Sequence, residues 1–448
     1  RPGVLDHLGL DGEVPMRTEA RSLVCPQPEG HITFAHDVKK TQESIAAYSK
    51  ADAGHYGRYR EFMLGQKQFL SGIFNETPPS LGEDAGVSDL WSLFSTALSL
   101  RRMGHDDMFA LLRTFPMCLR DFLGDWFETP ALKAGIALPA LLGSYVGPWA
   151  PSTSSLLLFD EAAKGRELEG SVRTLLDSLE RKCAERGVQV RTSCAFEEIL
   201  LENGCVCGVR VQGGEEFSTE KVLSTLDPKT TILDGFAPGY VPFKMRESMA
   251  NVRSRGITSV LMFALDGELK FQGAPNKVER FCVAEDLPSI EKCFDAPKYG
   301  VLPEHYVLEG AVPSYSDAGL APQGKHVVMV WAHGTAKELR SGWSRDNRES
   351  LIQGVSERIS TYAPGFSEQV EASALFTPED IETTYGVRGG HLFHVEPALD
   401  QVWGFRPTIH CSRYQTPIKG LFLGGSGSHP GGGVSLAPGA LAAKALLN

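Results

Sequence analysis

The sequence has little cysteine and no closely spaced metal or redox pair. Nine cysteines among 448 residues are an odd number. Cys205 and Cys207, which form the one close pair, have the wrong spacing for a zinc knuckle or a thioredoxin-type motif. We therefore expect reduced thiols in a cytosol-like compartment, and two cysteines on one side of a strand.

A long apolar run is also missing. Residues 134–159 come nearest to one, but Pro139, Pro148 and Pro151 interrupt them, and a membrane-spanning helix needs about 18 predominantly apolar residues in a row. No signal peptide is recognisable. The sequence predicts a soluble protein of the cytoplasm or of an organelle matrix. Peripheral membrane contact stays open as an alternative.

Positive charge is scarce relative to negative charge. The sequence has 44 lysines and arginines against 55 acidic residues, a net charge of −11. A nucleic-acid partner is therefore not expected, because phosphate binding requires a basic face. The chain exceeds the length at which one core keeps growing, so we expect two intertwined or successive domains.

Several catalytic motifs are absent as well. There is no Gly-x-Ser-x-Gly elbow, no His-Glu-x-x-His motif and no P-loop, so none of the corresponding chemistries is predicted. His391 and His394 would point to opposite faces of a strand, and no metal site is expected from them. The chain begins at Arg1 without an initiator methionine, which suggests a processed or truncated polypeptide.

Residues 421–447 are the most informative stretch. A short apolar run, Leu421-Phe422-Leu423, stops at a glycine cluster, and the segment beyond Pro438 is rich in alanine and leucine. The pattern predicts a strand, a glycine turn and a helix. Glycine has no side chain to hold a ligand away, so this layout lets the backbone approach a phosphate or a flat cofactor ring.

The remaining periodicity predicts a mixture of helices and strands. Residues 41–70 and 88–145 have helical spacing, and the second region is either core or the wall of a pocket for an apolar substrate. A helix from Val172 to the stop at Gly187 precedes strands at 188–191, 195–201, 205–211 and 221–225. Residues 255–345 read mainly as strands, and 348–362 as an amphipathic helix.

The C-terminal hundred residues contain a specific series of motifs. In order, they include Thr377-Pro378-Glu379-Asp380, Gly389-Gly390-His391-Leu392-Phe393-His394 and Gly427-Ser428-His429-Pro430-Gly431-Gly432-Gly433-Val434. This series resembles the phytoene-desaturase-like flavoproteins of the amine oxidase superfamily. The resemblance continues, more weakly but in the same order, from about Asp6. It implies an FAD-dependent oxidoreductase that oxidises an apolar substrate by hydride transfer to flavin.

The resemblance also implies an architecture. The fold class is mixed α/β, with an incomplete Rossmann-type FAD domain, an inserted β-sheet substrate domain and a helical cap. We assign residues 1–40, 160–235 and 365–448 to the FAD-binding-type domain, residues 41–159 to the helical cap, and residues 236–364 to the β-sheet substrate domain.

The resemblance assigns the site residues one by one. Phe196 matches the position whose backbone would meet the adenine. The positions expected beside the flavin ring and its ribityl chain are Gly425, Ser426, Gly432, Gly433 and Val434. A polar cluster shortly before the glycine stretch consists of Asp400, Arg406 and Tyr414. It serves either as a salt-bridged scaffold, which is the default interpretation, or to orient the substrate. No catalytic acid or base can be assigned; the candidates are His394, Arg406 and Tyr414.

Two departures from the family leave an alternative open. The family begins with a βαβ unit that contains Gly-x-Gly-x-x-Gly, and this sequence has none. A Gly-Gly loop before the helix at Val172 is replaced by Leu168-Glu169-Gly170-Ser171. Either the sequence given lacks residues that the protein has, or the chain is a flavin-free homologue that acts as a non-redox scaffold or lipophile-binding protein. A homo-oligomer or a partner chain stays open in both cases.

Overall fold

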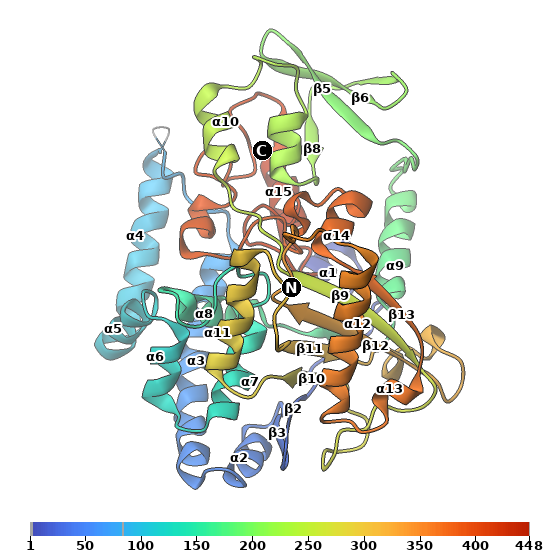
Figure 1. Ribbon diagram of the computed structural model, residues 1–448. Coiled ribbons are helices and arrows are strands. Elements are labelled where there is room, and N and C mark those ends of the chain that lie inside the picture. Colours follow the sequence, from blue (N-terminus) through green and yellow to red (C-terminus); the bar gives the residue numbers. More distant parts are fainter. Residues whose placement is uncertain (1–2, 83–84, 448) are drawn as a thin grey trace.

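A seven-stranded sheet occupies the centre of the computed structural model, which describes residues 3–82 and 85–447 (Figure 1). The strand order is β13-β9-β12-β11-β10-β2-β3, and only the β10–β2 pair is parallel. Successive side chains of a strand point to opposite faces, so each face needs its own cover. The strands are β2 (Leu23–Gln27), β3 (Gly30–Phe34), β9 (Thr258–Leu265), β10 (Arg280–Val283), β11 (Leu308–Ala311), β12 (His326–His333) and β13 (Val370–Phe376).

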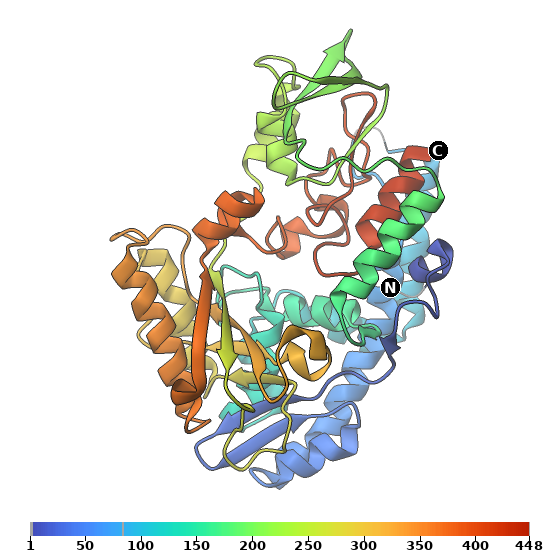
Figure 2. The same cartoon turned by 90° about the vertical axis from the view of Figure 1, so that its right-hand side faces the viewer.

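One face of the sheet packs against α12 (Arg345–Ser360). Alternate strand residues such as Phe263 and Val330 meet Leu351 and Val355 of this helix in a buried apolar cluster. The inward residues of α12 recur at helical spacing, as the sequence predicts. Figure 2 shows the sheet with α12 (orange) on one side and the blue and teal helices of residues 38–163 on the other.

The opposite face packs against a helical layer. Cys282 and Val307 of this face join a core with Leu132 and Leu138 of α7, which lies against β2 and β10. Tyr59 and Phe127, whose ring centroids are 5.2 Å apart, lie in the same core. The layer contains α2 (Val38–Ala46), α3 (Lys50–Asn75), α6 (Leu119–Trp126), α7 (Pro130–Ala140), α8 (Thr153–Ala163) and α11 (Leu287–Asp295).

Helices α4 (Val87–Arg102) and α5 (His105–Thr114) correct a sequence interpretation. Their apolar face reads as core or as a pocket wall, but Leu90 is 62% exposed and Phe94 57% exposed. Periodicity shows that one face of a helix is apolar, but it does not show what covers that face. Here the described residues leave it largely uncovered.

The upper part of the molecule contains smaller sheets. The strands β8 (Val222–Ser224) and β14 (Leu421–Leu423) are parallel, and β5 (Phe196–Glu202), β6 (Cys205–Val211) and β7 (Glu216–Ser218) form an antiparallel sheet. Further helices are α1 (Val4–Leu8), α9 (Val172–Glu185), α10 (Phe243–Ala250), α14 (Pro378–Tyr385) and α15 (Ala437–Leu447). Residues 188–191, predicted as a strand, form none.

The central sheet draws strands from two parts of the predicted domain division. β2, β3 and β13 come from residues 1–40 and 365–448, which the sequence assigns to the FAD-binding-type domain. They hydrogen-bond into one sheet with β9 to β12 of the 236–364 segment. The division into an FAD-type domain, a cap and a substrate domain stays a prediction. The hydrogen-bonded sheet includes strands from both sides of the predicted domain boundaries.

An ion pair ties α3 to α8 within the helical layer. Arg60 Nη1 lies 3.0 Å from Glu161 Oε2, and the Glu161 side chain is 4% exposed. Burial alone would raise the pKa of Glu161, but the hydrogen bonds and charges of Arg60 and Lys164 outweigh it and lower the pKa to about 2. The pair therefore stabilises the fold above about pH 4.5, and this stabilisation is lost as the pH falls toward 2.

Replacing this carboxylate should destabilise the protein in a pH-dependent way. We expect Glu161→Gln to lower the free energy of unfolding at pH 7 by about 3 kcal/mol, because the largely buried Arg60 guanidinium loses the carboxylate with which it pairs. The deficit should shrink as the pH falls from 4.5 toward 2. Urea titrations across this range would measure it, with the exposed Glu185→Gln as the control. A deficit that is independent of pH would contradict the ion-pair explanation.

Candidate cofactor site

The glycine stretch begins with two glycines that serve packing. β14 ends at Leu423, and a Cβ on Gly424 would lie 2.9 Å from the side chains of both Leu223 and Ala442. A Cβ on Gly425 would lie 2.4 Å from the carbonyl oxygen of Thr225. These positions let the turn after β14 press against β8 and α15, so their glycines are required whether or not a ligand binds.

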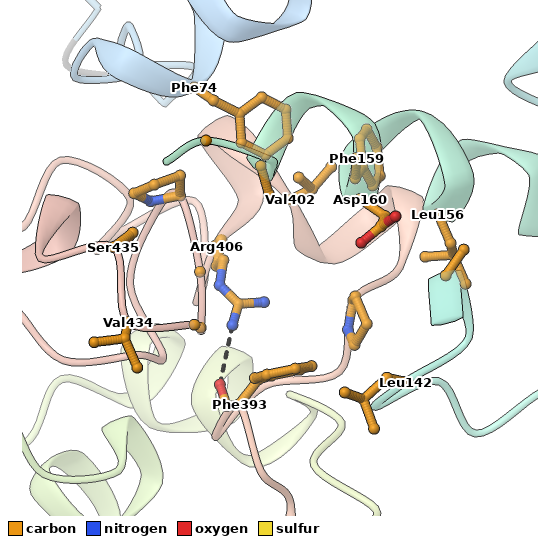
Figure 3. Close-up of a pocket in the computed structure, with 18 of the residues that line it drawn as sticks. Phe74, Leu142, Leu156, Phe159, Asp160, Phe393, Val402, Arg406, Val434 and Ser435 are labelled. Carbon is orange, nitrogen blue, oxygen red and sulfur yellow. Dashed lines mark hydrogen bonds between the residues drawn. The ribbon is translucent and has the colours of Figure 1, made fainter. Parts of the chain in front are cut away.

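The second half of the stretch opens into a cavity of about 320 Å³, which we call the glycine-side cavity (Figure 3). Gly433 has a φ of +92°, and among the described residues no atom beyond its chain neighbours lies within 4 Å of the position that its Cβ would occupy. The neighbouring Val434 side chain is 76% exposed. Asp160 of α8, which pairs with Lys164 at 2.9 Å, also lines this cavity. The rest of the opposite wall is mostly apolar and comes mainly from α3, α7 and α8, with Phe74, Pro139, Leu142, Leu156, Phe159 and Val402.

Arg406 is buried in the wall of this cavity, with 3% of its surface exposed. Its Nη2 donates to the carbonyl oxygen of Phe393 at 3.1 Å (Figure 3). Nη2 also donates to the carbonyl oxygen of Ser426 at 2.9 Å, and Nη1 donates to that of Val395 at 3.2 Å. Burial lowers the pKa of Arg406 to about 10, so the side chain stays charged at neutral pH. Among the described residues, its Nε has no hydrogen-bond partner.

The structure separates the predicted site residues into two groups. Gly432, Gly433, Val434 and Arg406 line the glycine-side cavity. Gly425 and Ser426 lie in the packed turn, where the Ser426 carbonyl serves Arg406. Contact of any of these residues with a ligand stays a prediction. Only the residues that line the glycine-side cavity lie together at one open space.

Phe196 does not line the glycine-side cavity. It begins β5, and its ring packs against Gly235, where a Cβ would lie 2.9 Å from the ring carbon Cζ. It belongs to the apolar cluster beneath β14. Neither of the cavities described in this section includes it in its wall. A contact of its backbone with adenine stays a prediction.

The predicted polar cluster is not assembled as one unit. Asp400 pairs with Arg253 through Oδ1 and Nη2 at 2.6 Å, whereas Tyr414 is fully buried and its hydroxyl donates to the carbonyl of His429 at 3.0 Å. Arg406 binds backbone carbonyls instead. The three residues thus hold three separate stretches of the C-terminal loops in place.

The two histidines of the Gly389–His394 motif lie in a turn, which corrects the strand expected there. His391 Nε2 lies 2.7 Å from the carbonyl oxygen of Gly143, and burial lowers the pKa of His391 to about 4. His394 has a φ of +64°, and burial also lowers its pKa. Across residues 3–82 and 85–447, no three histidine, cysteine or acidic side chains are grouped to hold a metal ion.

A second, larger cavity adjoins the first. Its volume is about 770 Å³, and the two cavities share five wall residues, Leu5, Met16, Leu142, Arg166 and Val434. We call it the sheet-side cavity, because β10, β11 and β12 contribute to its wall. Sequence reasoning missed its N-terminal and sheet residues, since no local pattern brings segments so far apart in the chain together.

These geometries agree with the family to which the sequence belongs. The family model described as "Flavin containing amine oxidoreductase" matches residues 17–443, so the chain belongs to this family. It is a flavin-dependent oxidoreductase with a mixed α/β fold, as predicted. In the described part of the chain, no helix is long and apolar enough to cross a membrane.

Individual relatives refine this placement. The chain is 29% identical over 442 residues to pyridine nucleotide-disulfide oxidoreductase domain-containing protein 2 of Rattus norvegicus, covering 93% of this chain and 76% of the relative. It is 24% identical over 426 residues to the zeta-carotene-forming phytoene desaturase of Myxococcus xanthus, covering 91% and 75%.

Solved structures show the same fold at low identity. An oxidoreductase from Methanosarcina mazei superposes with a TM-score of 0.54 at 13% identity, covering 99% of this chain and 83% of that one. Putrescine oxidase bound to putrescine gives a TM-score of 0.53 at 11% identity, covering 98% and 83%. At these identities the likeness is one of fold.

The carbonyl-binding role of Arg406 can be tested by its conservative replacement. A lysine ammonium cannot span the carbonyls of Phe393, Val395 and Ser426. We therefore expect Arg406→Lys to destabilise the protein by about 3 kcal/mol and to expose residues 424–436 to proteases. Thermal unfolding and limited proteolysis would measure both effects, with the exposed Arg345→Lys as the control. Unfolding and cleavage like those of the control would contradict the role.

Proposed function

We propose that this oxidoreductase holds FAD non-covalently beside residues 431–435 and oxidises an apolar substrate, introducing a double bond. The observation that carries the proposal is an open glycine backbone that faces an apolar cavity with a buried cation in its wall. The relatives named phytoene desaturases, from several bacteria, support the desaturase class.

The residues of the glycine-side cavity fit a flat, partly anionic ring system. Gly433 leaves its surroundings open, and the Nε of Arg406 is a buried donor without a partner among the described residues. A Cβ on Gly431 would lie 3.3 Å from this Nε, so the guanidinium lies directly beside the glycine backbone. No cysteine or histidine is among the described residues that line the cavity, which supports non-covalent binding.

When bound, FAD would supply a ring that accepts a hydride, which is two electrons together with one proton. The protein contributes the environment. Arg406 holds a positive charge that would favour negative charge on a group bound in the cavity, and this charge acts strongly because the side chain is buried. Phe74, Leu156 and Phe159 form an apolar wall that would orient a hydrocarbon and exclude water.

Absorbance of the purified protein tests the proposal. We expect a yellow protein whose flavin absorbance remains after gel filtration. Denaturation should release the flavin without cleavage of any covalent bond. A colourless protein whose spectrum does not change on addition of FAD would overturn the proposal. That result would favour the alternative, a flavin-free homologue that serves as a scaffold or binds lipophilic molecules.

A glycine substitution localises the site. A Cβ on Gly432 would lie 2.3 Å from Cδ1 of Phe393, so Gly432→Ala must displace that ring within the cavity. We expect FAD affinity to fall by about tenfold to a hundredfold, measured by titrating the apoprotein with FAD. Gly439→Ala in α15 is the matched control, because nothing lies within 4 Å of its added Cβ. Equal affinities of the two variants would place FAD elsewhere.

A further inference from the structure

The sheet-side cavity has one apolar wall and one charged wall. Leu5, Val14, Leu142, Val434 and Leu436 line the apolar side, which continues toward the glycine stretch. The charged wall belongs to the central sheet and to the segments beside it. Its charged members are Arg21, Arg166, Glu167, Arg173, Glu279, Arg280, Glu309 and Asp317. Arg166 pairs with Asp11 at 2.9 Å and Arg173 with Asp177 at 3.2 Å. Asp317 Oδ1 accepts from the backbone N–H of Gly319 at 3.0 Å.

Most charges of that wall are already paired. Arg21 Nη1 lies 2.9 Å from Glu167 Oε2, and Arg17 Nη1 lies 3.0 Å from Glu279 Oε1. Arg21 also donates to the hydroxyl of Ser316 at 3.0 Å. Groups that satisfy each other have little capacity left for a ligand. The selectivity of the wall therefore depends on the charges that are not satisfied.

Glu309 is the first of these charges. It is 6% exposed, and its Oε1 lies 3.1 Å from Nε2 of the fully buried His333. A carboxylate only accepts hydrogen bonds, so Nε2 carries the proton. The ring of Phe294 stacks on the imidazole at a centroid distance of 5.6 Å and fixes it. Among the described residues, no hydrogen bond reaches Oε2 of Glu309, and this atom is not fully enclosed.

Arg280 is the second. Cys282 pairs with Glu309 across β10 and β11, and Arg280 pairs with Ala311, so the side chains of Arg280 and Glu309 point to the same face of the sheet. The nearest carboxylate to Arg280 in the described structure is that of Glu167, with 4.0 Å from Nη1 to Oε1. No side-chain hydrogen bond of Arg280 is present among these residues. A free acceptor and a free donor thus share one face of the cavity.

We propose that the sheet-side cavity binds an amphipathic substrate by a neutral hydroxyl at its polar end, which donates to Glu309 and accepts from Arg280. The apolar body lies along Leu142 and Val434 toward the glycine-side cavity. An ammonium group would meet Arg280, and a carboxylate would meet Glu309, so both charged ends are disfavoured. The inference rests on the function proposed above and names the substrate class of that site.

Four eight-carbon probes separate these chemistries. Heptyl methyl ether is an isomer of 1-octanol that can accept but cannot donate a hydrogen bond, and octylammonium and octanoate carry the two charges. Each probe would compete with Nile red for the unmodified protein, with displacement followed by fluorescence. We expect 1-octanol to be about tenfold more potent than the ether, because it adds a hydrogen bond to a charged acceptor. Both ions should be weaker than 1-octanol.

Two variants assign the preference to this wall. In Glu309→Gln the amide oxygen remains with His333, so the NH₂ group faces the cavity and donates; the alcohol-to-ether ratio should fall to about one. In Arg280→Met, 1-octanol should lose about threefold in potency. Glu349→Gln, on the far helix α12 and paired with Arg345, is the matched control and should keep the tenfold ratio. Arg280 is partly exposed, so its variant remains informative if Glu309→Gln does not fold.

Three results would overturn the proposal: equal potency of alcohol and ether in the unmodified protein, a charged probe that outperforms 1-octanol, or an unchanged ratio in Glu309→Gln. Displacement needs neither turnover nor flavin. A colourless protein that keeps the alcohol preference would therefore overturn the proposed binding of FAD alone. A yellow protein without the preference would overturn the substrate class alone.

Discussion

Loops far apart in the C-terminal region meet on one guanidinium. Arg406 donates hydrogen bonds to carbonyl oxygens of the turn at residues 393–395 and to that of Ser426 in the glycine stretch. No carboxylate among the described residues pairs with it. A buried, unpaired charge is costly, and here backbone dipoles compensate it. The same contacts hold Phe393 against Gly432. The shape of the glycine-side cavity and the buried positive charge in its wall thus have a common origin.

This arrangement also explains why the glycines of the stretch are not equivalent. Gly425 is required by the carbonyl of Thr225, and Gly432 by the ring of Phe393, whereas nothing within the protein crowds Gly433. The first glycine fixes the turn after β14, the second allows the loop to close on the turn at Phe393, and the third leaves backbone open to a ligand. A motif that reads as uniform in sequence therefore combines packing and binding roles.

Local elements were largely predictable from the sequence, and long-range partners were not. The strand at 421–423, the helix after Pro438, the helix from Val172 and the strands near 258–265 and 326–333 follow from periodicity and from glycine and proline positions. Periodicity does not identify the partner of an element. The exposure of α4 and the entry of β2, β3 and β13 into the central sheet therefore escaped prediction. Gly432, Gly433 and Val434, which line the glycine-side cavity, were assigned to a predicted cofactor site through a motif. Glu309 and Arg280 carry no motif.

The two cavities together give a physical account of substrate orientation. A purely apolar molecule gains the same burial in either direction along the shared wall, because the hydrophobic effect is not directional. One hydrogen-bonding end group removes this degeneracy, provided that the protein offers an unsatisfied donor and acceptor at one end only. In the charged wall, Arg21 pairs with Glu167 and Arg17 pairs with Glu279, so these side chains have little hydrogen-bonding capacity left for a ligand. Glu309 and Arg280 keep such capacity. Pairing within the wall is thus what makes its remaining charges selective.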